Sequence, residues 1–279
     1  MPLTLLLIAG GVGTGVFGAL LGLGGGILIV PLLTLGFGLP FRDAVAVSLL
    51  AVITTSSASA AIYLARGAAN LRLGMTLELL TALGALFGGL LAFALDERLL
   101  AGLFAILLAY VAVSMARRRE GRPPGSAVPS GEPPIDGPRP GGYVATLGGA
   151  GYVVRRLPLG LALSAFAGVQ SALLGVGGGI VKVPAMHLVM GVPLRVATAT
   201  SNMTIGVTAS ASAMLYLARG AVDPYVAGPV VLGVFIGATI ASRLSHRVPL
   251  PLVRWLFVGV LTLVAFQMMA RALQVSISR

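Results

Sequence analysis

The chain has 279 residues, of which 57% are hydrophobic and only 10% are charged, whereas soluble domains usually carry about 25% charged residues. This composition excludes a soluble protein with an ordinary charged surface and predicts one that lies largely within a lipid bilayer. The formal net charge of +11 does not indicate a nucleic-acid partner, because Lys and Arg stand mainly at the ends of apolar segments, which is typical of inner-membrane topology.

Apolar segments fill the first part of the chain. The segment 3–21 lacks the basic region of a secretory signal, so we expect it to be retained in the membrane. A stretch of about 20 apolar residues is enough to cross the hydrocarbon core as a helix. Four further apolar segments follow, at 26–36, 44–65, 74–95 and 99–115.

A glycine-rich stretch, GALLGLGGGILIVPLL at 18–33, separates the first two apolar segments. Inside a helix each glycine costs about 1 kcal/mol and the proline about 3 kcal/mol, so we expect a broken or re-entrant helix. Irregular backbone at membrane depth is tolerated only where it is buried in protein or lines an aqueous cavity. If a half-helix begins after the glycines, its free N–H groups form an anion site; alternatively, the glycines only allow close helix crossing.

The composition changes abruptly from residue 117 to residue 156. This segment is rich in Pro and Gly and carries seven Arg against three acidic residues, and it cannot bury an apolar face. Its composition and positive charge predict a flexible, cytoplasmic linker. We therefore divide the chain into an N-terminal membrane repeat (1–116), the linker (117–156) and a C-terminal membrane repeat (157–279).

The apolar segments after the linker copy those before it with a constant offset of 153 residues. Glycines 24–26 correspond to glycines 177–179, and the sequence YLARGA at 63–68 recurs at 216–221. Paired halves with interrupted segments at matching positions are typical of secondary transporters, which bind substrate near the bilayer midplane. We predict an all-α polytopic membrane protein of about eight transmembrane helices in two homologous halves, each with a Gly-rich broken or re-entrant helix. Inverted repeats are the favoured arrangement, and parallel halves are the alternative.

Other glycines predict helix packing. The spelling GxGxxG at 13–18 lacks the strand–turn–helix context of a dinucleotide site. Small residues four apart let membrane helices approach closely. We expect such contacts at Gly11/Gly15, Gly84/Gly88 and Gly233/Gly237.

Small polar residues concentrate on the segment that follows each glycine-rich stretch. They include Ser48, Thr54 and Thr55 in the first half, and Ser201, Asn202 and Thr208 in the second. Such side chains often bond only to a neighbouring helix or to their own backbone, but their concentration here suits a path for a small polar solute. Asn202 is the sharpest candidate among them, because a buried amide is costly and its counterpart, Leu49, is apolar.

The apolar run GIVKVPAM at 179–186 contains a lysine, Lys182, where the first half has Ile29. Ionisable residues inside membrane segments are functional candidates by default; the alternative is a lysine that extends from a short helix to the interface. Gln170 is a weaker candidate in the same half. Glu78 stands near a segment end and is assigned no role.

The remaining polar residues do not assemble into catalytic machinery. No Ser/His/Asp triad, carboxylate pair or phosphate-binding loop can be built from them. Two histidines without any cysteine are too few for a metal site of the usual kind. We therefore expect no enzymatic activity, no cofactor and no metal.

The glycine-rich stretch and its repeat, SALLGVGGGIVKVPAM, are followed by GLPFRDA or GVPLRVA and then by YLARGA. Together these motifs resemble the TauE/SafE sulfite exporter family (TSUP) of membrane permeases. The likeness covers both halves and leaves out only the linker. It implies a secondary transporter of small sulfur-containing or organic anions such as sulfite or sulfonates. Some relatives that carry sulfur compounds rely on cysteine, which this chain lacks, so thiosulfate-type chemistry is not expected.

We therefore predict a multi-pass inner-membrane carrier that exports sulfite, a sulfonate or a similar small anion by alternating access. Export of a monoanion from a negative interior gains about 2.3 kcal/mol per 100 mV and needs no co-ion, whereas uptake would need a proton or a sodium ion. The alternatives are an anion channel and a membrane scaffold that acts through its linker; no oligomeric state is assigned. The predicted substrate-binding residues are Gly24, Gly25, Gly26, Gly177, Gly178, Gly179, Lys182, Ser48, Thr54, Thr55, Ser201, Asn202, Thr208 and Gln170.

Overall fold

The computed structural model describes residues 2–21, 26–65, 67, 69–117, 146–149, 152–244 and 250–277. Within these ranges the chain is helical, apart from turns and an isolated β-bridge between Gly149 and Tyr152. Most of the predicted linker, together with Gly24 and Gly25 of the predicted site, lies outside the described residues.

The helices follow the apolar segments expected from the sequence. The first half contains α1 (Pro2–Leu21), α2 (Gly26–Pro31), its π-helical continuation η1 (Leu32–Gly36), α3 (Phe41–Ala65), α4 (Leu71–Ala94) and α5 (Glu97–Arg117). The second half contains α7 (Leu157–Leu174), α8 (Gly179–Pro184), its continuation η2 (Ala185–Val189), α9 (Leu194–Ala218), α10 (Pro224–Leu244) and α11 (Leu250–Ile277). From α8 to α11, each helix begins 153 residues after its counterpart in the first half.

A proline interrupts each of the two short helices, and the backbone after it widens into a π-helix. Pro31 precedes η1, and Pro184 precedes η2. Proline lacks an N–H and its ring clashes with the preceding turn, so the regular α-helical ladder ends there. The broken helix predicted in each half is present at both positions.

Eight of the described helices are 18 residues or longer, namely α1, α3, α4, α5, α7, α9, α10 and α11. Six of them contain a stretch that is long and apolar enough to cross a membrane, and α1 and α9 are the two that do not. α9 nevertheless has 25 residues, which is about 37 Å at the rise of an α-helix, and its apolar pattern is broken by Ser and Thr. The prediction of an all-α polytopic membrane protein is confirmed.

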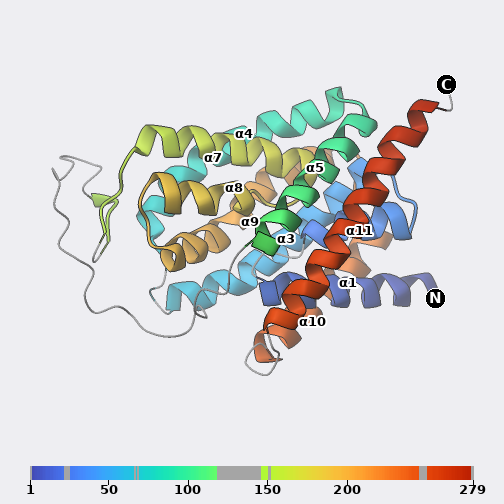
Figure 1. Ribbon diagram of the computed structural model, residues 1–279, viewed down its shortest axis with the longest axis horizontal. Coiled ribbons are helices and arrows are strands. Elements are labelled where there is room, and N and C mark those ends of the chain that lie inside the picture. Colours follow the sequence, from blue (N-terminus) through green and yellow to red (C-terminus); the bar gives the residue numbers. More distant parts are fainter. Residues whose placement is uncertain are drawn as a thin grey trace.

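The two halves exchange helices in the folded protein (Figure 1). α1 of the first half packs against α10 of the second, and α7 of the second half packs against α4 of the first. α3 packs against its own counterpart α9, and α5 against its counterpart α11. This pattern is that of a pseudo-two-fold axis that relates the halves.

The predicted glycine contacts hold the exchanged helices together. A Cβ atom added at Gly11 of α1 would lie 2.6 Å from the carbonyl oxygen of Val230 in α10. In the equivalent pair, a Cβ atom at Gly88 of α4 would lie 2.6 Å from the carbonyl oxygen of Val169 in α7. Since real Cβ atoms do not approach a backbone so closely, these positions require glycine, and the packing prediction is confirmed.

Contacts between helix ends show that the two halves are inverted. Asn70, just before α4, donates hydrogen bonds to Leu147 (2.8 Å) and to the hydroxyl of Tyr152 (2.7 Å) in the segment before α7. α4 and α7 therefore begin at the same end of the molecule, which we call the linker end. Arg42, at the start of α3, donates to Leu95 after the end of α4 (2.7 Å), so α3 begins at the opposite end. When the helices are followed in turn from these ends, α5 finishes at the linker end and its counterpart α11 finishes at the opposite end. Corresponding helices of the two halves therefore run in opposite directions, and the favoured inverted repeats are confirmed.

The last part of the predicted linker is packed against the membrane helices. Leu147, Tyr152 and Val154 are buried, and the N–H of Arg155 donates to the carbonyl of Met190 (3.0 Å). The three buried residues belong to a hydrophobic cluster formed with α4, η2 and α9, which includes Leu73, Leu77, Met186 and Ala197. The predicted flexibility does not extend to this end of the segment.

Candidate functional site

Gly26, where α2 begins, and Gly175, where α7 ends, meet inside the molecule, beside α3. The hydroxyl of Ser48 on α3 lies 3.0 Å from the carbonyl oxygen of Gly26 and 2.7 Å from that of Gly175, so it bridges the two breaks. The two backbones also touch, since a Cβ atom added at Gly26 would lie 2.7 Å from the Gly175 oxygen. One re-entrant pair, α1 and α2, thus enters from the opposite end, and the other, α7 and α8, enters from the linker end.

The second break owes its shape to glycine. Gly175, Gly177 and Gly178 have φ angles of +69°, +80° and +70°, in the left-handed region that other residues rarely adopt. Gly178 is the residue before α8, and a Cβ atom there would lie 2.9 Å from the carbonyl oxygen of Ala167 in α7. The turn therefore brings the start of α8 into close contact with α7.

Lys182, on α8, forms a buried ion pair with Glu78 of α4. Its Nζ donates to Glu78 Oε2 and to the hydroxyl of Thr204 on α9 (3.0 Å). The other carboxylate oxygen, Oε1, accepts a hydrogen bond from Thr208 of α9. Lys182 is 1% exposed and Glu78 is 3% exposed, so both charges are removed from solvent and lipid. Burial of a charge is costly unless it is paired and hydrogen-bonded, and this network meets that requirement.

The ion pair determines the orientation of the Lys182 side chain. Its side chain does not extend to the membrane interface, which was the alternative expected from the sequence, because it is buried against α4 and α9. Glu78 was assigned no role from the sequence, and that assignment is wrong. One feature could have identified it: Glu78 is the single charged residue of the apolar segment 74–95.

Unpartnered polar atoms flank the second break. The hydroxyls of Ser164, Ser171 and Ser201 and Oε1 of Gln170 are buried and have no hydrogen-bond partner within the part of the chain that the structure describes. Ser171 lies against Gly178 and Ser201 against Gly179, each 3.5 Å from a Cβ atom added at the glycine. Buried polar groups are nearly always hydrogen-bonded. The two hydroxyls beside the break therefore retain hydrogen-bonding capacity for a small polar solute.

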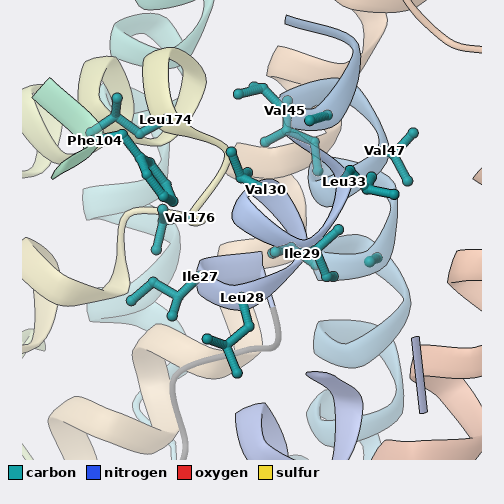
Figure 2. Close-up of a cluster of buried hydrophobic side chains, with 14 of the residues drawn as sticks. Ile27, Leu28, Ile29, Val30, Leu33, Val45, Val47, Phe104, Leu174 and Val176 are labelled. Atoms are coloured by element: carbon teal, nitrogen blue, oxygen red, sulfur yellow. The ribbon is translucent and has the colours of Figure 1, made fainter. Parts of the chain in front are cut away.

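This polar cluster has no copy in the first half. At the repeat offset, Ile29 corresponds to Lys182, Val231 to Glu78, and Ala51 to Thr204. Figure 2 shows Ile29 among apolar side chains of α2 and α3. At the corresponding position of the second half, Lys182 instead forms its ion pair with Glu78. Among the described residues, the charged cluster therefore occurs at one of the two positions related by the pseudo-two-fold axis, the one that contains α8.

Of the predicted Ser and Thr residues, those on α9 lie near the ion pair, and the two threonines on α3 bond within their own helix. Thr208 joins the ion-pair network, and Ser201 lies one turn before Thr204. Thr54 and Thr55 bond to carbonyls of their own helix, Leu50 (3.0 Å) and Val52 (3.1 Å). These bonds match the alternative expected from the sequence, in which a threonine in a membrane helix bonds only to its own backbone. Their predicted contact with substrate has no support in this geometry.

Asn202 and Gln170 stand apart from the ion pair. The carbonyl oxygen of Asn202 accepts a hydrogen bond from Ser56 of α3 (2.8 Å), so Asn202 lies at the contact between α3 and α9. Gln170 lines a largely apolar cavity of about 610 Å³ between α5, α7, α8 and η2, which also reaches Val181, the neighbour of Lys182. Among the described residues, no group of three or more His, Cys, Asp or Glu gathers to hold a metal ion.

Comparison with known proteins agrees with the membrane fold. The family described as "Sulfite exporter TauE/SafE" matches residues 7–268. The chain is similar to the probable membrane transporter protein YunE of Bacillus subtilis (strain 168), with 25% identity over 87% of this chain and 88% of the relative. It is also similar to a probable membrane transporter protein of Xylella fastidiosa (strain 9a5c), with 26% identity over 82% of this chain and 79% of the relative. No solved structure matches the chain. Since the family match spans nearly all of both halves, the protein is a multi-pass membrane transporter, not an enzyme, and belongs to the TauE/SafE sulfite exporter family.

Proposed function

We propose that this transporter carries a small sulfur-containing or organic anion, such as sulfite or a sulfonate, by alternating access. The observation that carries the proposal is the buried Lys182, placed beside a glycine break and two unpartnered serine hydroxyls. A lysine ammonium with hydroxyl and backbone donors around it is suited to an oxyanion, because charge-assisted hydrogen bonds are the strongest of their class.

In the proposed site the anion lies between Lys182 and the second break. Ser171 and Ser201 supply hydroxyl donors, and the N–H groups of the turn through Gly177 and Gly178 add backbone donors. Irregular backbone inside a membrane transporter commonly forms part of the substrate site. The helix after the first break is apolar around Ile29 and contributes no charge to the proposed site.

The inverted halves support the proposed alternating access. Two re-entrant pairs enter from opposite ends and meet at Ser48, so a rocking motion of one half against the other opens the site to one side at a time. In the present conformation the site is closed, since Lys182 is almost fully buried. Towards the linker end it is covered by the buried cluster that contains Leu73 and Leu77.

Charge at the two ends orients the protein in the membrane. Five exposed arginines, and no acidic residue among the described positions there, stand at the linker end, at Arg72, Arg117, Arg155, Arg156 and Arg195. The opposite end carries arginines and acidic residues in equal number among the described residues, Arg42, Arg98, Arg219 and Arg271 with Asp43, Asp96, Glu97 and Asp223. Because excess Lys and Arg usually face the cytoplasm, we propose that the linker end lies inside the cell. A monoanion carried alone from that side leaves the cell with the membrane potential, in the export direction expected from the sequence.

Transport in proteoliposomes tests the proposal. The double variant Lys182→Met with Glu78→Leu removes the cation without leaving its carboxylate unpaired. We expect it to fold but to lose sulfite and sulfonate flux to the level of protein-free vesicles. The matched control, Arg72→Met with Glu97→Leu, removes two exposed charges and should retain flux. Unchanged flux in the Lys182 variant would overturn the proposed site, and flux without saturation or counterflow would indicate a channel.

A further inference from the structure

We propose that Glu78 is the proton-binding group of this transporter, and that its carboxylate competes with the transported anion for Lys182. The inference rests on the proposed function and assigns a coupling ion to the same site. It is carried by the geometry of the ion pair. One carboxylate oxygen of Glu78 accepts a hydrogen bond from Lys182, and the other accepts one from Thr208.

Charge balance is the first step. Lys182 and Glu78 together carry no net charge, and both are almost fully buried. An anion that binds at Lys182 leaves the site with one uncompensated negative charge in a medium where that charge is poorly solvated. Protonation of Glu78 restores neutrality, so proton and anion are expected to bind together.

No other described group takes over this role. The remaining titratable or charged side chains on the elements packed around the pair, and on the segments that flank them, are exposed or hydrogen-bonded elsewhere: Arg72, Tyr152, Arg155, Arg156, His187, Arg195, Tyr216 and Arg219. Tyr152 accepts from Asn70, and the Tyr216 hydroxyl donates to the carbonyl of Ala172. Glu78 is therefore the group through which the charge at Lys182 changes.

Thr208 allows the exchange without leaving Glu78 unpaired. Its hydroxyl donates to the carboxylate now, and a hydroxyl can also accept. A protonated Glu78 can donate to the same oxygen after the hydroxyl rotates, and Lys182 is then released. Lys182 keeps its bond to Thr204, and the unpartnered Ser201 lies one turn before Thr204 on the same helix, α9.

Coupling changes what drives transport. A monoanion that moves with one proton carries no net charge, so its flux should not respond to the membrane potential. Instead, the anion and proton gradients together set the direction. A high internal anion concentration drives export, and an inward proton gradient drives uptake.

The test uses methanesulfonate in proteoliposomes, because this anion stays singly charged over the whole pH range in which proteins are folded. For the wild type we expect a pH difference to support accumulation of about tenfold per pH unit, as one proton per anion requires. Proton entry reported by a dye inside the vesicles should match anion entry one for one, and valinomycin-imposed potentials should have no effect. Anion movement that is electrogenic and carries no protons would overturn the inference.

Glu78→Gln is the informative variant, since glutamine resembles the protonated carboxyl. We expect methanesulfonate exchange across the membrane to persist while accumulation driven by a pH difference is lost. The matched control Glu97→Gln changes an exposed carboxylate and should keep full coupling. If Glu78→Gln retains pH-driven accumulation, the inference is wrong. If the wild type exchanges neither sulfite nor methanesulfonate, the proposed function itself is wrong, so the two failures are distinguished.

Discussion

At the scale of single residues, the decisive feature is that one ion pair is shared by three helices. Lys182 comes from α8, Glu78 from α4, and the hydroxyls that complete the network from α9. Each charge is therefore stabilised by groups distant in the chain. Loss of one partner leaves the other buried and uncompensated, which costs more than loss of both.

The stability of single and double variants tests this dependence. Lys182→Met alone leaves Glu78 buried without its cation, and we expect a loss of about 3–5 kcal/mol in the free energy of unfolding. Lys182→Met with Glu78→Leu should recover most of that loss, since no charge remains. Denaturant unfolding in detergent micelles measures both variants. Equal stability of the two would show that the charges are not coupled.

At the scale of elements, the sequence predicts the breaks well and the linker poorly. Four glycines and a proline within a short apolar run are costly in any helix, so their positions predicted where α8 and α2 begin. The packing of Leu147 and Val154 could not be predicted, because these residues show no helical or strand periodicity. Asn70, which another part of the chain contributes, donates a hydrogen bond to the carbonyl oxygen of Leu147.

Alanine substitutions test why the break before α8 requires glycine. Gly178→Ala combines a left-handed φ of +70° with a close approach to α7, so it should lower the stability by more than the roughly 1–2 kcal/mol of the backbone cost alone. Gly220→Ala has a similar φ, +71°, but open space around it, and should show only the backbone cost. Gly228→Ala, inside α10 with open space, should stabilise by up to about 1 kcal/mol. Thermal unfolding in micelles ranks the three, and a tolerated Gly178→Ala would contradict this account.

At the scale of the whole molecule, the exchange of helices between halves is what the sequence could not show. The repeat predicted two related halves, but matching arginines such as Arg42 and Arg195 left inverted and parallel arrangements alike in charge. The same exchange explains why Glu78 was missed. It stands in the first half, and its partner comes from the second, so the pair exists only because α4 packs against α7 and α9.

Cysteine labelling tests the inverted arrangement and its orientation together. The chain has no cysteine, so single-cysteine variants report without background. Arg72→Cys and Tyr225→Cys occupy equivalent positions of the two repeats, and both positions are exposed. Arg72 lies in the first turn of α4 at the linker end, whereas Tyr225 lies in the first turn of α10 at the opposite end. A membrane-impermeant maleimide applied to intact cells should therefore label Tyr225→Cys at once and Arg72→Cys only after lysis. Parallel halves would put both positions on the same side and give both variants the same response, and an inverted insertion of the whole protein would exchange their responses.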